Sequence, residues 1–193
     1  MKGRNGLLIG GGILFAILLI ATVLLSVERF VPPRRAAESA PPAAVETATA
    51  TAHITATLFY MAPDGRTLVP VRREVPLATL AEALGAQILT ELFAPAPPPY
   101  VSVIPKGTTL RAFYITNRGD AFVDLSPEVT TAHPGGTLAE LLTVYAIVNA
   151  VTVNLPSVQR VQILVDGKEV DTIAGHVDVR RPLARNASLV KGT

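Results

Sequence analysis

Cysteine is absent from this sequence, and histidine occurs only three times. The absence of cysteine excludes a lipid-modified cysteine as a membrane anchor, and it removes the usual sequence evidence for an oxidising or reducing compartment. His53, His133 and His176 are scattered along the chain, and none has another ligand residue at metal-binding spacing. The sequence therefore predicts no metal site, and no motif in it predicts a cofactor.

An excess of basic residues is also missing from most of the chain. The formal net charge is +2, and residues 1–52 account for all of it, because basic and acidic side chains balance over residues 53–193. Domains that bind DNA or RNA carry clustered lysine and arginine in excess. The charge balance therefore predicts that nucleic acid is not a partner.

One long uncharged run lies near the start of the chain. Residues 6–27 contain no charged side chain, and a helix rising about 1.5 Å per residue would extend them to roughly 30 Å, the thickness of a bilayer's hydrocarbon core. The run is longer than the apolar part of a signal peptide, and no small-x-small cleavage site follows it directly. We therefore predict an uncleaved transmembrane helix over residues 6–27.

The segments around this helix complete the predicted topology. Basic residues flank both of its ends, so charge alone does not orient it. A short tail, residues 1–5, is easier to keep in the cytoplasm than a whole domain, so we predict a single-pass protein whose C-terminal domain is extracytoplasmic. Residues 28–52 are rich in Pro, Ala and Thr without apolar periodicity, which predicts a flexible linker. Residues 184–193 are predicted to form a flexible tail.

A domain is predicted over residues 53–183. Apolar and polar residues alternate regularly in its first half. Period-two apolar residues predict strands over 53–60 and 67–75, joined by a turn at 63–66. Pro70 places the second strand at a sheet edge or a bulge. Pro76 suits the first turn of a helix, and the pattern from Leu77 to Leu92 is that of an amphipathic helix, which Pro95 ends.

The second half repeats the order of two strands followed by a helix. Residues 110–114 and 121–125 predict a hairpin with a tight turn at 117–120. Thr137 and Glu140 have the spacing of a capping box that opens a largely apolar helix through Val151. The last strand is predicted over 161–165, with a turn at Asp166-Gly167 and a return strand that runs through Val170 to Ile173. The order ββαββαββ predicts an α+β fold, a two-layer sandwich of one antiparallel-rich sheet with both helices on one face.

Catalytic residues are scarce. Asp124, Ser126 and His133 are the only candidates for a Ser–His–Asp arrangement. Ser126 is followed by Pro127 and Glu128, a pattern typical of a strand exit and not of a nucleophile elbow. We therefore predict a protein that is not an enzyme and has no catalytic residue, and an envelope hydrolase stays as an alternative.

Short motifs follow one another in a fixed order along the domain. They are Leu58-Phe59-Tyr60, Asp64-Gly65, Leu68-Val69-Pro70-Val71, Ser102-x-Ile104-Pro105-x-Gly107-Thr108, Asp124-Leu125-Ser126-x-Glu128, Gly135-Gly136-Thr137 with Glu140, Ile147-Val148-Asn149-Ala150-Val151-Thr152, and Val165-Asp166-Gly167. In order and spacing the set resembles the GerMN domain family of spore-germination proteins, in a single copy that covers nearly all of residues 56–182. The resemblance implies an extracytoplasmic, non-enzymatic α+β module of sporulation, germination or envelope assembly.

The leading hypothesis is thus a membrane-anchored module that binds other envelope or sporulation proteins. Sheet edges and the solvent-exposed sheet face are the surfaces expected to bind them, since edge pairing is a common route to assembly. A module that binds peptidoglycan is the alternative from a different class.

Overall fold

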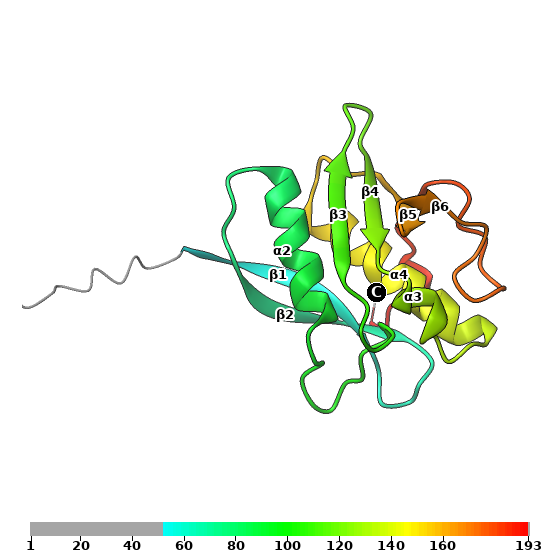
Figure 1. Ribbon diagram of the computed structural model, residues 1–193. Coiled ribbons are helices and arrows are strands. Elements are labelled where there is room, and N and C mark those ends of the chain that lie inside the picture. Colours follow the sequence, from blue (N-terminus) through cyan, green and yellow to red (C-terminus); the bar gives the residue numbers. More distant parts are fainter. Residues whose placement is uncertain (1–51, 193) are drawn as a thin grey trace, which may run out of the picture. The chain divides into compact units, whose positions relative to one another are not determined.

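The computed structural model describes residues 52–192 (Figure 1). The predicted cytoplasmic tail, the transmembrane helix and nearly all of the predicted linker lie outside the described residues. Residues 50–193 form one compact unit, and the buried apolar residues of its core run from Ala56 to Val190. This unit therefore contains a complete core of its own, as expected of a domain that folds by itself.

Two sheets make up the strand part of the domain. The first is an antiparallel pair, β1 (His53–Met61) and β2 (Leu68–Pro76). The second has the order β3-β4-β5-β6, with β7 also pairing with β5. Its strands are β3 (Leu110–Ile115), β4 (Asp120–Leu125), β5 (Arg160–Val165), β6 (Lys168–Glu169) and β7 (Leu183–Ala184).

Two long helices connect the sheets by packing against both. Helix α2 (Ala81–Phe93) packs against β3 and β2, helix α4 (Thr137–Asn154) packs against β1 and β5, and the two helices contact each other. The short helix α3 (Glu128–Thr131) and the 3-10 turn η1 (Ala187–Leu189) complete the elements. Because α4 packs against strands of both sheets, it is apolar around most of its circumference, as the sequence predicted.

Helix α4 is also long and apolar enough to cross a membrane, judged by length and composition alone. It is the one such helix among residues 52–192, and 56% of its span is buried inside the domain. Burial of this extent is that of a core helix.

The α+β class is confirmed, but the predicted single sheet is wrong, because the strands form two sheets. Antiparallel pairs predominate as predicted, and β4 and β5 form the one parallel pair among the named strands of residues 52–192. The parallel pairing follows from the long crossover through α3 and α4, which returns the chain to the sheet in its original direction. The hairpin pattern of the sequence shows strands and turns but does not reveal which strands meet across a crossover.

Local predictions failed at three element boundaries. Pro76 is the last residue of β2, paired with His53, and α2 begins only at Ala81. The expected capping box does not form, because the residue before α4 is Gly136 and no side chain caps the helix. The return strand after the turn at 166–167 is present but shorter than predicted, because β6 is Lys168–Glu169 and ends before Val170. The last two failures have one cause, which is the carboxylate of Glu140 described below.

The C-terminal residues do not form the predicted loose tail. Strand β7 pairs with β5, so that Arg160 lies opposite Ala184. The segment after it crosses the first sheet, where the backbone N–H of Lys191 donates to the carbonyl of Leu68 at 2.8 Å. The structure therefore makes residues 184–192 a part of the domain.

Candidate functional site

Asp124, Ser126 and His133, the candidate residues of the hydrolase alternative, each form hydrogen bonds with other parts of the domain. Asp124 Oδ1 accepts a hydrogen bond from the N–H of Gly167 at 2.7 Å. Ser126 Oγ accepts one from the N–H of Thr109 at 2.9 Å. His133 bonds elsewhere, to Gly135 and Thr143. No hydrogen bond joins any two of the three in the described part of the chain, so no Ser–His–Asp arrangement is assembled.

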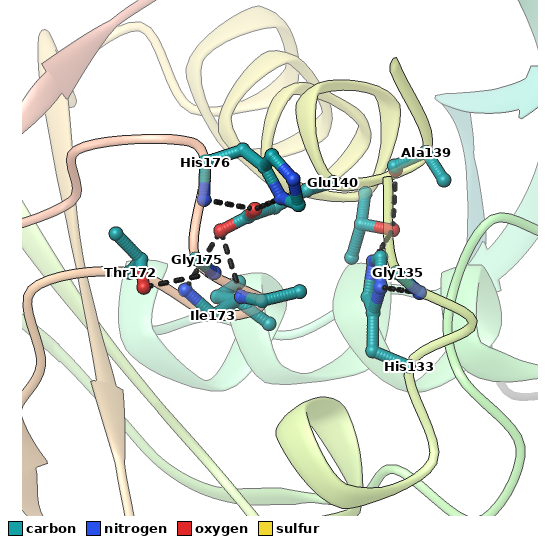
Figure 2. Close-up of polar contacts among 10 residues, drawn as sticks. His133, Gly135, Ala139, Glu140, Thr172, Ile173, Gly175 and His176 are labelled. Carbon is teal, nitrogen blue, oxygen red and sulfur yellow. Dashed lines mark hydrogen bonds and ion pairs between the residues drawn. The ribbon is translucent and has the colours of Figure 1, made fainter. Parts of the chain in front are cut away.

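A different acidic residue, Glu140, is at the centre of a polar cluster with a loop after β6 (Figure 2). Its side chain is fully buried. One carboxylate oxygen accepts the N–H groups of Ile173 and Ala174 at 2.9 and 2.8 Å. The other accepts the N–H of His176 at 2.8 Å and lies 3.2 Å from its Nδ1. Glu140 thus satisfies the backbone of the loop 171–177, and this explains why that loop is not a strand.

Electrostatics favour the ionised form of this carboxyl. Burial raises the pKa of Glu140, but the backbone N–H groups of the loop, with Ala174 and His176 foremost, lower it by more. The net pKa lies below the ordinary value. The sequence shows the Thr-x-x-Glu spacing, whereas the partners of Glu140 lie 33 to 36 residues away along the chain, so no local signal identified this role.

Thr143, three residues after Glu140 and therefore on a neighbouring face of α4, holds two further loops. Thr143 Oγ1 donates to the carbonyl of Val103 at 2.6 Å and lies 3.2 Å from His133 Nε2. A groove of about 270 Å³ opens here, lined by residues 102–106, Ala132, Pro134 and α4. The start of α4 therefore gathers three loops that are distant in sequence.

His133 should make folding sensitive to mild acid. Burial is the main cause that lowers its pKa, the charge of Glu140 acts in the opposite sense, and His176 lowers it further. A histidine with a depressed folded pKa is protonated first in the unfolded chain, so stability is complete above the unfolded pKa of about 6.5 and falls as pH drops through the folded pKa. We expect urea midpoints at pH 7.5, 6.5 and 5.5 to decrease, and to decrease less in His133→Gln. Parallel curves for the two proteins would contradict this.

The outer edge of β1 is already paired at two positions. Asn154 at the end of α4 bonds both backbone groups of Thr57, accepting its N–H at 2.8 Å and donating to its carbonyl at 2.7 Å. Met61 exchanges two backbone hydrogen bonds with Val101, at 2.9 and 3.1 Å. The middle and the C-terminal end of this edge are therefore already paired.

The outer edge of β2 is protected in another way. The backbone N–H and C=O groups of Thr57 and Met61 point away from β2. In an antiparallel pair the backbone groups of their cross-strand partners, Arg72 and Leu68, then point away from β1. Pro70 and Pro76 have the same alternation and also face outward. Proline has no N–H to offer a further strand. The C-terminal segment pairs with Leu68. Pro70 thus lies on an edge strand, as the sequence predicted.

Strand β3 presents an edge without a strand partner. Among residues 52–192 it pairs with β4 alone, and α2 packs against it. The N–H of Thr116 donates to Asp120 at 2.9 Å, which fixes the alternation and turns the N–H groups of Phe113 and Ile115 away from β4. Neither group finds an acceptor within residues 52–192. Tyr114 between them is 59% exposed. This β3 edge, the backbone of residues 113–115, is the candidate interaction surface.

Comparisons with solved structures agree with the observed fold. A Clostridium perfringens protein described as a lipoprotein matches with a TM-score of 0.50 and 25% identity, over 70% of this chain and 89% of its own. The first GerMN domain of the sporulation protein GerM from Bacillus subtilis matches with a TM-score of 0.51 and 19% identity, over 68% of this chain and 98% of that domain. The tandem GerMN domains of the same protein match with a TM-score of 0.55 and 18% identity, over 69% of this chain and 46% of theirs.

Sequence comparison assigns the family. No protein with a curated description matches this chain. The family described as Germane, sporulation and spore germination, matches residues 57–171, which is more than half of the chain and spans β1 to the loop after β6. The chain belongs to the Germane family, whose description is sporulation and spore germination.

Proposed function

We propose that this protein is a single-pass, non-enzymatic module of sporulation, germination or envelope assembly that binds a partner protein outside the cytoplasm. Family membership supports the general role. The similar Clostridium perfringens protein is described as a lipoprotein, and this supports attachment to a membrane. The hydrolase alternative has no assembled site in the described residues, because Asp124, Ser126 and His133 are bonded to other groups.

The open edge of β3 is the observation that carries the binding proposal. A partner strand laid along it meets the free backbone groups of Phe113 and Ile115, and the exposed ring of Tyr114 lies between them. Main-chain hydrogen bonds of this kind give affinity in β-augmentation, and neighbouring side chains give specificity. The outer edges of β1 and β2 offer less, since Asn154, Val101 and two prolines occupy or block them.

Ile115→Pro tests this edge directly. It removes one outward N–H and keeps the bonds to β4, so the domain is expected to fold, as circular dichroism would check. Crosslinking in cells followed by partner identification should recover at least tenfold less of each partner than with the wild type, since a blocked ladder costs about 1–2 kcal/mol per hydrogen bond.

Asn117→Pro is the matched control for that variant. The N–H of Gly119 donates to Thr116, which makes Asn117 the second residue of the hairpin turn, a position that favours proline. Its partner yield should equal that of the wild type. Equal yields from all three proteins, or recovery of abundant bystanders alone, would overturn the edge as the binding surface.

A separate experiment tests the membrane topology. Because the chain has no cysteine, a single introduced thiol reports on one position. Arg118→Cys places a single thiol on the exposed hairpin of the domain, and Lys2→Cys places one in the predicted cytoplasmic tail. In intact spheroplasts, a membrane-impermeant maleimide should label Arg118→Cys and leave Lys2→Cys unlabelled until the cells are lysed. The reverse pattern would place the domain in the cytoplasm and remove the proposed setting.

Peptidoglycan binding is the second candidate, and the groove beside α4 favours it. Lys106 lines this groove and makes no ion pair within residues 52–192, so it can attract the carboxylates of a cell-wall stem peptide. Residues 50–193 should sediment with purified peptidoglycan, and Lys106→Glu should reduce the pelleted fraction. The absence of pelleting by the wild-type fragment would rule this candidate out.

A further inference from the structure

An apolar groove on the outer face of the β1–β2 pair, apart from the β3 edge, has a lining suited to a small molecule. Its volume is about 350 Å³, within the range of roughly 300–1,000 Å³ that ligand sites occupy. Phe59, Pro70, Val153 and Val190 supply the apolar surface, and Arg185 is the one charged residue of the lining. We propose that this groove binds the alkyl chain of a fatty acid, whose carboxylate pairs with Arg185.

The groove is held together by the C-terminal segment that sequence analysis expected to be loose. The side chain of Asn149 in α4 bonds the backbone of Asn186 twice, donating to its carbonyl and accepting its N–H, each at 3.0 Å. Lys191 fixes the end of the segment on Leu68 of β2. The wall of the groove is therefore anchored at both ends.

The backbone groups of Thr57 and the side chain of Asn149 at the groove are already engaged, and this favours an alkyl chain over a peptide. Both backbone groups of Thr57 bond Asn154, and the amide of Asn149 is used by Asn186. Pro70 has no N–H. A peptide would bring several backbone amides into a site with few partners, and each unpaired buried amide is costly. An alkyl chain brings no polar group and gains from burial.

The charges at the groove favour an anionic head group. Arg185 is exposed and makes no ion pair among the described residues. Arg72, the direct cross-strand neighbour of Thr57, lies on the same outer face and is also without an ion pair there. The acid next along this face, Glu74, is hydrogen-bonded to Thr55 and is not within ion-pair distance of either arginine. A carboxylate in the groove would therefore meet the guanidinium group of Arg185 without a competing acid, and the charge of Arg72 lies on the same sheet face.

Sodium dodecanoate below its micelle concentration is the probe, with residues 50–193 in detergent-free buffer. We expect saturable binding by calorimetry, with amide NMR shifts concentrated at Thr57, Phe59 and Val153. Dodecyltrimethylammonium, which has the same chain and the opposite charge, should bind at least tenfold more weakly. This measurement involves no partner protein, so its failure would leave the β3-edge proposal unaffected.

Two variants test the head group and the alkyl chain separately, and a third serves as the control. Arg185→Glu should weaken dodecanoate about tenfold, the value of one charge-assisted contact. Arg118→Glu, which reverses an exposed arginine on the distant hairpin, should change affinity less than twofold. Val153→Trp should fill the groove and abolish binding while circular dichroism stays unchanged.

Three results would overturn the proposal. The first is absence of saturable dodecanoate binding, and the second is equal affinity for the cationic amphiphile. The third is occupation of the groove by polypeptide, shown if sedimentation velocity finds a dimer that Val153→Trp disrupts, or if an acetyl-Leu-Phe-Glu peptide shifts the same amides where dodecanoate does not.

Discussion

Glu140→Ala should lower the free energy of unfolding by about 3–5 kcal/mol, which is a large part of the stability of a domain this size. The substitution removes a fully buried carboxylate and leaves the N–H groups of Ile173, Ala174 and His176 without their acceptor. Each buried donor left unpaired costs about 1–3 kcal/mol. Urea unfolding of residues 50–193 at pH 7 would measure the loss.

Glu140→Gln separates charge from volume. The amide keeps the shape but replaces one acceptor oxygen by an NH₂ group that faces backbone donors, so we expect a loss of about 2–3 kcal/mol. Hydrogen exchange should show that the amides of Ile173 and Ala174 lose protection before the rest of the core. Glu82→Gln, at an exposed position in the first turn of α2, should leave stability nearly unchanged. A loss below about 1 kcal/mol in Glu140→Ala would contradict the anchoring role.

The difference in unfolding free energy between the wild type and Glu140→Gln should change with pH in a defined direction. The folded pKa of Glu140 lies below its ordinary value of 4.5, because the loop N–H groups outweigh burial. A carboxyl of this kind contributes its full stability above the unfolded pKa, and the contribution is lost as pH falls through the folded pKa. The difference between wild type and Glu140→Gln should therefore be constant near pH 7 and shrink below pH 4.5. A difference that grows in acid would show that the carboxylate is not stabilised by the loop.

Glu140 also shows which kind of contact the sequence could not predict. Periodicity located β1 to β5 and both long helices, because alternation and amphipathic spacing are local properties that tertiary packing preserved here. The Thr-x-x-Glu spacing at 137–140 fits a capping box equally well whether or not the box forms. The Glu140 carboxylate binds the loop at 173–176 and not the first turn of its own helix. No local sequence pattern predicts that contact.

The same reason explains the C-terminal error and the sheet error. Residues 184–192 have little periodicity of their own, and they are ordered by Asn149, 37 residues from Asn186 along the chain. The parallel pairing of β4 with β5 depends on a crossover through α4. The open β3 edge became visible only once all strand neighbours were known, although Pro70 correctly marked β2 as an edge strand.

Gly85→Val should destabilise the domain by about 3 kcal/mol through overpacking between α2 and β3. A β-carbon at Gly85 would lie 2.6 Å from Cζ and 2.9 Å from Cδ1 of the Phe113 ring, and Phe113 is itself 8% exposed, so the ring has little room to move. Glycine inside a helix costs up to about 1 kcal/mol relative to alanine, which the close approach of α2 to β3 offsets. Ala83→Val, at an exposed position of the same helix, carries the β-branched penalty without the clash and should cost less than about 1 kcal/mol.

A double-mutant cycle with Phe113→Ala tests whether the ring is the cause. Phe113→Ala alone is expected to cost about 3–5 kcal/mol because it leaves a cavity. In the double variant the valine at position 85 occupies part of that cavity, so the combined loss should fall short of the sum of the single losses by at least about 1.5 kcal/mol. Additive losses in urea unfolding would mean that Gly85 is required for another reason. A shortfall of the expected size would show that the contact between α2 and β3 sets the position of the strand whose open edge is proposed to bind the partner.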